Sequence, residues 1–573
     1  MPVHNTEIAE IFDHVADLLE IKGANRFRVR AYRNAANTVR DQSRSVADMV
    51  ENDEDLSELP DIGGDLADKI AEIVKTGQLS LLQEISGDVP DAIVAATRIP
   101  GIGPKRAKAL FEELDLGSID DLRKAAEDGK IAKIAGFGPK TQSRIREELS
   151  RGDFGEHRIR IDVAQDYAEP LLDWIRKIDG VKKAEIAGSY RRRKETVGDL
   201  DILVAGEDGK AIMDRFTGYD EIEKVVSKGK TRATVMLRSD IQVDLRVIPE
   251  ESWGAALHYF TGSKAHNIAG RRRAQDRGLK LNEYGVFDGD SRVAGATEED
   301  VYKKIGLPWI DPVLRETRGE IEAAEKGNLP DLVTIDDIRG DLHAHTKASD
   351  GKNTLREMAR AAQDRGYEYL AITDHSKSQS VAGGLDEDEI EAQIEEIDAL
   401  NEEFDGFRLL KSCEVDILGD GSLDFPDDLL KKLDLVVASV HSKFNLSADA
   451  QTNRIIRAMD NPLVSIVGHP TGRLIGSRRP YQIDVGHLVE AAKERGCCLE
   501  LNADPHRLDL NDVNCRMARD HGVKIAISTD AHSTGGLGNM RYGVDQARRG
   551  WLGADDVLNT RSWRDVARIL QRG

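Results

Sequence analysis

Apolar residues recur at helical spacing near the start of the chain and give way to strand-like patterns further along. The first run places six apolar side chains on one face of a helix: Ile8, Ile11, Phe12, Val15, Leu18 and Leu19. β-prone residues at 202–204 and the alternating stretch IQVDLRVIP at 241–249 indicate strands in the middle of the chain. From Arg339 onward, apolar strand-like segments alternate with helical ones, which is typical of a parallel α/β fold. The pattern therefore predicts helices first, strands next, and an α/β region last.

With 573 residues, the chain is too long for a single hydrophobic core, so three or more domains are expected. Charged residues make up 32% of it, and no apolar run is long enough to cross a bilayer. Glu7, Glu10 and Asp13 interrupt any basic, apolar signal peptide. The four cysteines form neither a spaced zinc quartet nor an obvious disulfide framework: Cys413, Cys497, Cys498 and Cys515. These features predict a soluble protein of the reducing cytoplasm with no membrane partner.

The formal net charge of -22 argues at first against a nucleic-acid partner, because phosphate binding needs local positive charge. The basic residues are clustered, however, in RFRVRAYR at 26–33 and in the arginine triplet at 271–273. Local basic surfaces are therefore compatible with DNA binding.

A glycine-containing phrase recurs three times, as LPDIGGDLADKI from Leu59, IPGIGPKRAKAL from Ile99 and IAGFGPKTQSRI from Ile134. Glycine permits a tight turn, and the helix that follows directs backbone N–H groups at a phosphate. These repeats resemble helix-hairpin-helix elements, which hold the DNA backbone without reading its sequence. The first copy departs from the pattern, with Asp61 where glycine is usual and Asp65 near the expected phosphate. The candidate DNA-contacting residues of the first two copies are Gly63, Gly101, Gly103 and Lys105.

The stretch GSYRRRKETVGDLDILV at 188–204 places basic residues before a pair of acidic ones. Residues two apart in a strand face the same way, so Asp199 and Asp201 present their carboxylates together. Such carboxylates suit Mg²⁺, and Asp244 in the alternating stretch downstream supplies a third. A D-x-D pair alone is usually a solvated strand edge, but the turn before it and the third aspartate favour a two-metal site for nucleotidyl transfer. The residues of the turn that suit a triphosphate are Gly188, Ser189, Arg192 and Gly198.

These motifs resemble those of the family X DNA polymerases, the polymerase beta-like enzymes, over residues 1–318. The stretch YFTGSKAHN, which begins at Tyr259, is similar to the nucleotide-binding turn and helix of the family. The resemblance implies that Tyr259, Phe260 and Gly262 pack against the incoming sugar. It also implies that Asn267 reaches the base of the nucleotide.

The same resemblance assigns further residues and shows two departures. It places Arg271 near the template minor groove and Arg246 beside the catalytic carboxylates. Relatives often carry arginine where this chain has Gln242, and Lys264 beside the nucleotide is also unusual. Members of the family often remove 5′-deoxyribose phosphate through a lysine Schiff base, and Lys69 occupies the matching place.

Potential ligands occur at the ends of the strand-like segments in the last part of the chain. In a barrel these ends converge on one face, where active sites lie. Imidazole groups suit Zn²⁺, Mn²⁺ or Fe²⁺, and carboxylates can bridge several ions. The segments supply the following groups: His343, His345, His375, Glu414, His441, His469, Glu500, Asn502, Asp530 and His532.

This region, 339–573, resembles the PHP (polymerase and histidinol phosphatase) domain, a distorted (β/α)7 barrel that hydrolyses phosphate esters with up to three metal ions. The resemblance implies one ion held by His343, His345, Glu414 and Asp530. A second ion shares Glu414 and adds His441 and His469. A third uses Asp350, His375 and His532.

The resemblances together imply an all-α helix-hairpin-helix region, an α+β palm and thumb, and an α/β barrel. The expected domains are a lyase-like helical domain, a helix-hairpin-helix fingers domain, a nucleotidyltransferase palm, a thumb, a linker and a PHP domain, at 1–86, 87–155, 156–250, 251–318, 319–338 and 339–573 respectively.

We therefore expect a monomeric polymerase that fills short gaps in base excision repair, with gapped or nicked double-stranded DNA and deoxynucleoside triphosphates as partners. Two Mg²⁺ or Mn²⁺ ions are expected in the palm and up to three Mn²⁺, Zn²⁺ or Fe²⁺ ions in the barrel. The barrel is expected to act as a 3′–5′ exonuclease, a 3′-phosphatase or an abasic-site endonuclease. Two alternatives are a histidinol-phosphate-type phosphatase with a regulatory N-terminal half and a non-catalytic DNA-end-binding scaffold.

Overall fold

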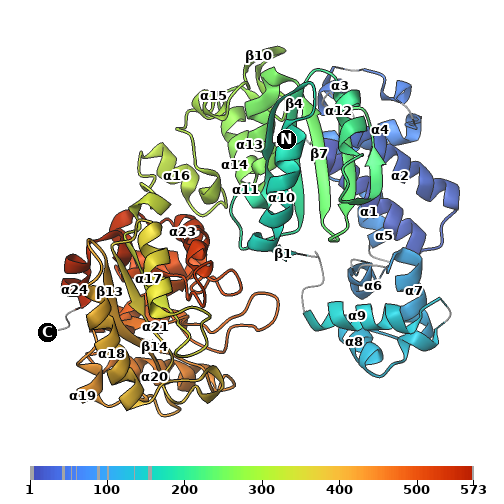
Figure 1. The fold of residues 1–573 in the computed structure, drawn as a ribbon. Helices are drawn as coiled ribbons and strands as arrows, with labels where there is room; N and C mark the ends of the chain where they lie inside the picture. The colour runs from blue at the N-terminus through green and yellow to red at the C-terminus, as the bar shows by residue number, and fades with distance from the viewer. Residues whose placement is uncertain are drawn as a thin grey trace. The chain divides into compact units, whose positions relative to one another are not determined.

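A computed structural model gives the fold of the chain (Figure 1). Two compact units make up the chain: one runs to Glu325, and the other runs from Lys326 and includes 160–162 and 193–195. Within the part of the chain that the structure describes, no helix is long and apolar enough to span a bilayer. The described residues are 5–41, 46–52, 54–59, 61–86, 89, 91–97, 99, 102–134, 136–151 and 158–570.

The N-terminal part of the first unit is helical, as the sequence predicts. Phe12 and Tyr32 join the first two helices edge to face, with ring centroids 5.5 Å apart. A helix begins directly after Gly63, Gly103 and Gly138, so each glycine-containing repeat ends at the first turn of a helix. The elements are α1 (Asn5–Ile21), α2 (Arg26–Asp41), α3 (Val46–Glu51), η1 (Leu56–Glu58), α4 (Gly64–Thr76), α5 (Ser80–Ser86), α6 (Asp91–Ala96), α7 (Pro104–Glu113), α8 (Ile119–Glu127), η2 (Ile131–Lys133) and α9 (Pro139–Arg151).

A five-stranded sheet follows, in the order β2-β4-β7-β6-β5. Its central pair, β4 and β7, is parallel, whereas the other neighbouring strands are antiparallel. Short strands β1 (Ile159–Arg160) and β3 (Thr196–Val197) pair separately. The main elements are α10 (Ile161–Arg176), β2 (Val181–Ile186), α11 (Gly188–Arg191), β4 (Asp199–Gly206), α12 (Gly209–Phe216), β5 (Ile222–Lys228), β6 (Arg232–Leu237) and β7 (Gln242–Ile248).

The first unit ends in a helical part with a small antiparallel sheet, in the order β10-β9-β8. Helices α13 and α15 approach so closely that a Cβ at Gly254 would overlap the backbone of Thr297. The elements are η3 (Glu250–Ser252), α13 (Trp253–Thr261), α14 (Lys264–Gln275), β8 (Lys280–Asn282), β9 (Gly285–Asp288), β10 (Ser291–Ala294), α15 (Glu298–Lys304), η4 (Pro312–Leu314) and α16 (Glu320–Glu325).

The second unit contains a seven-stranded parallel sheet with strands in sequence order, from β11 to β17. Backbone hydrogen bonds from Asp530 to His343 and from His345 to Ala531 bring the last strand back beside the first, so the sheet forms a nearly closed barrel. Helices α17, α20 and α21 pack against these strands, since their residues Met358, Ile455 and Leu488 share one apolar cluster with the strand residues Leu370 and Val467. The (β/α)7 expectation is confirmed.

The barrel strands alternate with helices along the chain. The inward-facing residues Leu342, Tyr369 and Val437 pack with Val566 and Leu570 of the last helix in one apolar cluster. The strands are β11 (Gly340–Ala344), β12 (Tyr369–Ile372), β13 (Arg408–Asp416), β14 (Leu435–Ser439), β15 (Ile466–Val467), β16 (Cys498–Asn502) and β17 (Ile525–Ser528). The helices are η5 (Ile335–Asp337), α17 (Leu355–Asp364), η6 (Ser380–Ala382), α18 (Glu387–Asn401), α19 (Asp427–Leu430), α20 (Ala448–Met459), α21 (Val485–Arg495), α22 (Asp512–Asp520), η7 (Gly536–Asn539), α23 (Met540–Arg549), η8 (Ala554–Asp556), η9 (Leu558–Thr560) and α24 (Trp563–Leu570).

Two candidate metal-binding active sites

Two neighbouring parallel strands carry the acidic residues of the first site. Asp201 on β4 lies opposite Asp244 on β7 in the strand register, and Asp199 lies opposite Gln242. Burial raises the pKa of Asp201 well above its ordinary value, and the negative charges of Asp199 and Asp244 raise it further. The geometry therefore concentrates negative charge that a divalent cation would balance, and carboxylate oxygens suit Mg²⁺ or Mn²⁺.

Three side chains hold the Asp244 carboxylate. Arg232 Nη2 donates to Oδ1 at 2.9 Å, and Thr234 Oγ1 donates to the same oxygen at 2.5 Å. Gln242 Nε2 donates to Oδ2 at 2.8 Å. Burial raises the pKa of Asp244, but the charge of Arg232 and these hydrogen bonds bring it below its ordinary value. Sequence reasoning missed Arg232 and Thr234, although their two-residue spacing on β6 puts them on one face of the sheet.

The turn before β4 lies against the carboxylates. Gly188 has a φ of +60°, and a Cβ there would collide with the Asp201 carboxylate, so the position requires glycine. Ser189 follows within the short helix α11, and Gly198 connects β3 to β4. The expected triphosphate turn is therefore adjacent to the expected metal ligands.

Two arginines of this turn contact carboxylates of the thumb. Arg192 Nε donates to Glu316 Oε1 at 3.0 Å, and its Nη1 donates to the Thr261 carbonyl. Arg191 makes a bidentate pair with Glu298, which also accepts from Arg315 Nη1 at 2.6 Å. These contacts fix the turn against α13 and α15.

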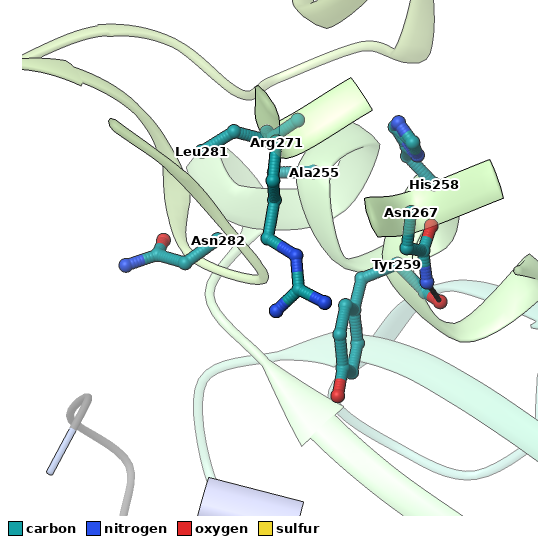
Figure 2. Close-up of a pocket in the computed structure, with 7 residues that line it drawn as sticks. All are labelled: Ala255, His258, Tyr259, Asn267, Arg271, Leu281 and Asn282. Carbon is teal, nitrogen blue, oxygen red and sulfur yellow. Dashed lines mark hydrogen bonds between the residues drawn. The ribbon is translucent and has the colours of Figure 1, made fainter. Parts of the chain in front are cut away.

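Figure 2 shows a small pocket in the thumb. Asn267 Nδ2 donates to the Tyr259 carbonyl at 2.7 Å, which fixes the amide group. In Figure 2 the side chains of Arg271 and Tyr259 extend in the same direction from α14 and α13. The pocket thus gathers three residues that the resemblance assigns to nucleotide and template. The complete lining is Ala255, His258, Tyr259, Asn267, Arg271, Leu281 and Asn282.

The remaining residues of the nucleotide-binding stretch lie in or next to α13 and α14. The guanidinium carbon of Arg246 is 4.6 Å from the centroid of the Phe260 ring. Gly262 ends α13 with a φ of +68°, and Lys264 is exposed at the start of α14. His266, which sequence reasoning missed, is buried between Glu320 Oε1 at 2.6 Å and the Tyr302 hydroxyl at 2.8 Å.

The helix-hairpin-helix candidates are exposed where the structure describes them. Gly63 and Gly103 precede α4 and α7, and the Lys105 side chain is 80% exposed. Asp61 adopts the left-handed φ of +61° that glycine usually supplies in this motif. Gly101 lies outside the described residues.

Lys69, the lyase candidate, is engaged by a neighbouring acid. Its side chain is 19% exposed, and Lys69 Nζ lies 2.5 Å from Asp65 Oδ1 one helical turn earlier. Asp65 is one of the two residues, with Asp61, by which the first repeat departs from the usual pattern.

The second site lies at the carboxyl ends of the barrel strands, and every expected ligand is there. Among the described residues, His, Asp and Glu side chains form three sets in which the potential ligand atoms all lie within 4.8 Å of one another. All three sets belong to this barrel, and the palm carboxylates form no such set. The sets are His343, His345 and Asp530; His375, Glu414 and His441; and His345, Asp350, His375 and His532.

The grouping differs in detail from the expected ligand sets. His345 contributes to two groups, and His375 joins Glu414 as well as Asp350. His469 Nε2 lies 2.9 Å from Glu414 Oε1, so it lies beside the group to which the resemblance assigned it. A single imidazole has two ring nitrogens, which lets His345 and His375 face two clusters.

The donor atoms fit divalent metal ions. His343 Nε2 and His345 Nε2 face each other at 3.1 Å, an arrangement in which a metal ion can satisfy both lone pairs. Burial lowers the pKa of His375, but Glu414 and Asp350 raise it to about 10. This shift reflects concentrated negative charge, which metal ions would balance. Mixed imidazole and carboxylate ligands suit Mn²⁺, Zn²⁺ or Fe²⁺.

A second layer of residues orients these ligands. Glu500 Oε1 lies 2.7 Å from His343 Nδ1, and Asp416 Oδ1 lies 2.5 Å from His441 Nδ1. Each contact turns the other ring nitrogen toward the cluster. The sequence showed Glu500 at a strand end but gave it no role, and it missed Asp416.

Family models match most of the chain. A helix-hairpin-helix domain matches residues 3–79, and a SAM-like helix-hairpin-helix tandem matches 94–151. The DNA polymerase beta palm and thumb match 158–259 and 256–316, and the PHP domain matches 341–504.

Individual relatives agree with these matches. The DNA polymerase/3′-5′ exonuclease PolX of Bacillus subtilis (strain 168) is 38% identical over 574 residues, which cover 100% of both chains. A probable phosphatase of Thermoanaerobacter sp. (strain X514) is 34% identical over 242 residues, or 40% of this chain and 92% of the phosphatase. A probable phosphatase of Caldanaerobacter subterraneus is 33% identical over 38% of this chain and 86% of its own length. The chain therefore belongs to the PolX family, the family X DNA polymerases that carry a C-terminal PHP domain.

Proposed function

We propose that this chain extends the 3′ end of DNA in short gaps and also removes nucleotides from 3′ ends as a 3′–5′ exonuclease. The observation that carries the proposal is the presence of two separate ligand sets, one in the palm and one in the barrel. Both occur in a chain that matches a polymerase/exonuclease along its whole length. Gaps left by base excision are the proposed substrate of the polymerase.

In the palm, Asp199, Asp201 and Asp244 are the proposed ligands of two Mg²⁺ or Mn²⁺ ions. Such ions would supply activation of the primer 3′-hydroxyl and charge neutralisation at the triphosphate. Ser189 and Arg192 are proposed to hold the triphosphate, for which Arg192 must exchange its contact with Glu316 for a phosphate oxygen. Tyr259 and Asn267 are proposed to contact the sugar and base.

In the barrel, the histidines and carboxylates are proposed to hold up to three Mn²⁺, Zn²⁺ or Fe²⁺ ions. The ions would supply an activated water and charge stabilisation at the phosphodiester. Glu500 and Asp416 keep His343 and His441 turned toward the cluster. An exonuclease, not a small-molecule phosphatase, is favoured because the barrel belongs to a chain with DNA-polymerase domains.

The experiment uses 5′-labelled gapped DNA with Mn²⁺, with and without nucleotides. Asp201→Ala should abolish extension and leave shortening intact, and His343→Ala should do the reverse. Glu223→Ala, an exposed acid on β5 of the palm sheet, is the matched control and should change neither activity. Loss of both activities in either single variant, with the fold intact, would contradict two independent sites.

A further inference from the structure

An arginine beside the barrel cluster has an unused donor. Arg507, in the loop after β16, places Nε 3.4 Å from Asp530 Oδ2. Its Nη1 is buried without a hydrogen-bond partner among the described residues. A guanidinium group stays positively charged at any ordinary pH. The residue is therefore a fixed positive charge next to the expected metal ligands.

The loop that carries Arg507 is held on both sides. Leu508 is fully buried, and its carbonyl accepts a hydrogen bond from Arg473 Nη2 at 2.5 Å. The Ile475 backbone N–H donates to the His506 carbonyl at 2.6 Å. These contacts join the loops after β15 and β16, and a supported loop keeps a side chain in one position.

An aromatic and basic pair belongs to the loops that follow two ligand-bearing strand ends. The Arg478 guanidinium carbon is 4.4 Å from the centroid of the Phe444 ring. Phe444 is three residues after His441, so it extends from a strand end that carries an expected ligand. Arg478 Nε donates to the Gly472 carbonyl at 2.8 Å, three residues after His469.

A backbone contact brings this pair near Arg507, and a second ring supports it. The Ile475 N–H, three residues before Arg478, donates to the carbonyl of His506, the residue before Arg507, at 2.6 Å. The Phe444 ring is nearly parallel to that of Tyr481, with centroids 6.1 Å apart. Tyr481 is buried and supports the Phe444 ring from the protein interior, whereas Phe444 and Arg478 are partly exposed.

We propose that the mouth of the barrel holds the 3′-terminal part of a single DNA strand. Arg507 contacts the phosphate that is cleaved, and the Phe444–Arg478 pair is a stacking surface for a base. Aromatic rings and guanidinium groups stack on bases of any sequence, which suits a nuclease that must process every nucleotide. The proposal rests on the exonuclease function proposed above and adds its substrate contacts.

The chemistry is hydrolysis of the last phosphodiester. Water adds its hydroxyl to phosphorus, and the bond from phosphorus to the O3′ of the preceding nucleotide breaks. That O3′ takes up the remaining proton, so the products are a nucleoside 5′-monophosphate and a new 3′-hydroxyl. Arg507 would stabilise the charge on the non-bridging oxygens while the bond breaks.

The test compares two substrates with the full chain in Mn²⁺. One is a short 5′-labelled single strand, and the other is the p-nitrophenyl ester of thymidine 5′-monophosphate, a diester without a second base. Arg507→Gln should lower kcat/KM about ten- to hundred-fold on both substrates, as for loss of a hydrogen bond to a charged group. Phe444→Leu should raise KM on the strand about five-fold or more and leave the small diester unchanged.

Arg516→Gln is the matched control, because Arg516 also lies over an aromatic ring, 4.0 Å from the Trp551 centroid, but on α22. This variant should leave kcat/KM unchanged on both substrates. Bound Mn²⁺ is measured for each variant and should equal that of the wild type. Arg507→Lys keeps the positive charge but not the planar guanidinium group, so its kcat/KM should lie between those of the wild type and Arg507→Gln.

Three results would overturn the inference while the wild type remains an exonuclease. The first is that Arg507→Gln has the same kcat/KM as the wild type. The second is that Phe444→Leu raises KM equally on the strand and on the small diester. The third is that both Arg507 variants lose bound Mn²⁺ in proportion to their loss of activity. A wild type that releases phosphate from monoesters but does not shorten DNA would instead contradict the proposed exonuclease function itself.

Discussion

Asp201 on β4 and Asp244 on β7 are neighbours in the parallel register of the palm sheet, but their electrostatic environments are opposite. Burial and neighbouring negative charges raise the pKa of Asp201 well above its ordinary value. Burial acts the same way on Asp244, but Arg232 and the hydrogen bonds to its carboxylate reverse the shift. Arg232 and the hydrogen bonds therefore stabilise the charged form of Asp244, whereas burial and the neighbouring carboxylates destabilise the charged form of Asp201.

Arg232→Gln should reduce polymerase activity because it removes the positive charge that holds Asp244. The other two guanidinium nitrogens of Arg232 are buried without hydrogen-bond partners among the described residues, so the hydrogen bond to Asp244 is the side-chain contact that the substitution removes. Loss of a hydrogen bond to a charged group predicts a fall of about ten- to hundred-fold in the rate of single-nucleotide insertion. Arg238→Gln, an exposed position after β6, is the control and should insert at the wild-type rate.

The double variant Arg232→Gln/Gln242→Arg tests whether an arginine at another position can replace Arg232 as the charged partner of Asp244. Gln242 already donates to the other oxygen of Asp244, so an arginine there would restore a charged donor from the same strand. We expect partial recovery of insertion relative to Arg232→Gln alone. Wild-type activity in Arg232→Gln, or no recovery in the double variant, would show that Arg232 does not stabilise the charge of Asp244.

Gly188→Ala should abolish primer extension, because the added Cβ disturbs the catalytic carboxylate in addition to straining the backbone. Gly188 has a positive φ, and an added Cβ would displace the Asp201 carboxylate. Gly278 is a matched control, because it has a φ of +71° and nothing within 4 Å of an added Cβ. Each substitution should cost about 1 kcal/mol of stability from the left-handed backbone. Only Gly188→Ala should lose gap filling, and equal insertion rates in the two variants would contradict the collision.

The sequence predicted those features whose residues are close together in the chain. The helices after Gly63 and Gly103 follow from local turn chemistry, and His343 and His345 reveal themselves by ending a strand. Contacts between distant segments were not predictable in the same way. Arg232 reaches Asp244 from an adjacent strand, and Glu500 reaches His343 from β16, two strands away in the nearly closed barrel. The sequence shows the strand alternation that makes such contacts possible, but not which strands become neighbours.

Glu298→Gln should destabilise the thumb, because Glu298 is the buried partner of Arg191 and Arg315. Removing one member of a buried charge network costs about 3–5 kcal/mol. Amide hydrogen exchange in peptides from α13 and α15 measures this locally and should become faster. Glu299→Gln, an exposed neighbour on α15, should leave exchange unchanged.

The same network predicts a pH dependence. Burial raises the pKa of Glu298, but Arg315 and Arg191 bring it well below its ordinary value. Its contribution to stability is therefore present above the unfolded-state pKa of about 4.3 and is lost as the pH falls toward the folded-state value. Wild-type exchange in α15 should accelerate as the pH falls below about 4, after correction for intrinsic exchange. Glu298→Gln should lack this component, and an identical pH profile in the two proteins would contradict the assignment.

Glu500→Gln should weaken metal binding in the barrel without affecting the polymerase. The fully buried Glu500 lies 2.7 Å from His343 Nδ1 and accepts a hydrogen bond from the His469 backbone N–H at 2.6 Å. A glutamine keeps the shape but loses the negative charge that makes the imidazole a stronger ligand. Mn²⁺ affinity, measured by calorimetry on the metal-free chain, should fall about ten- to hundred-fold, and shortening of DNA should recover at higher Mn²⁺. Glu490→Gln, exposed on α21, should bind Mn²⁺ like the wild type. If activity stays low at saturating Mn²⁺ in Glu500→Gln, then Glu500 contributes to hydrolysis directly and not by orienting His343.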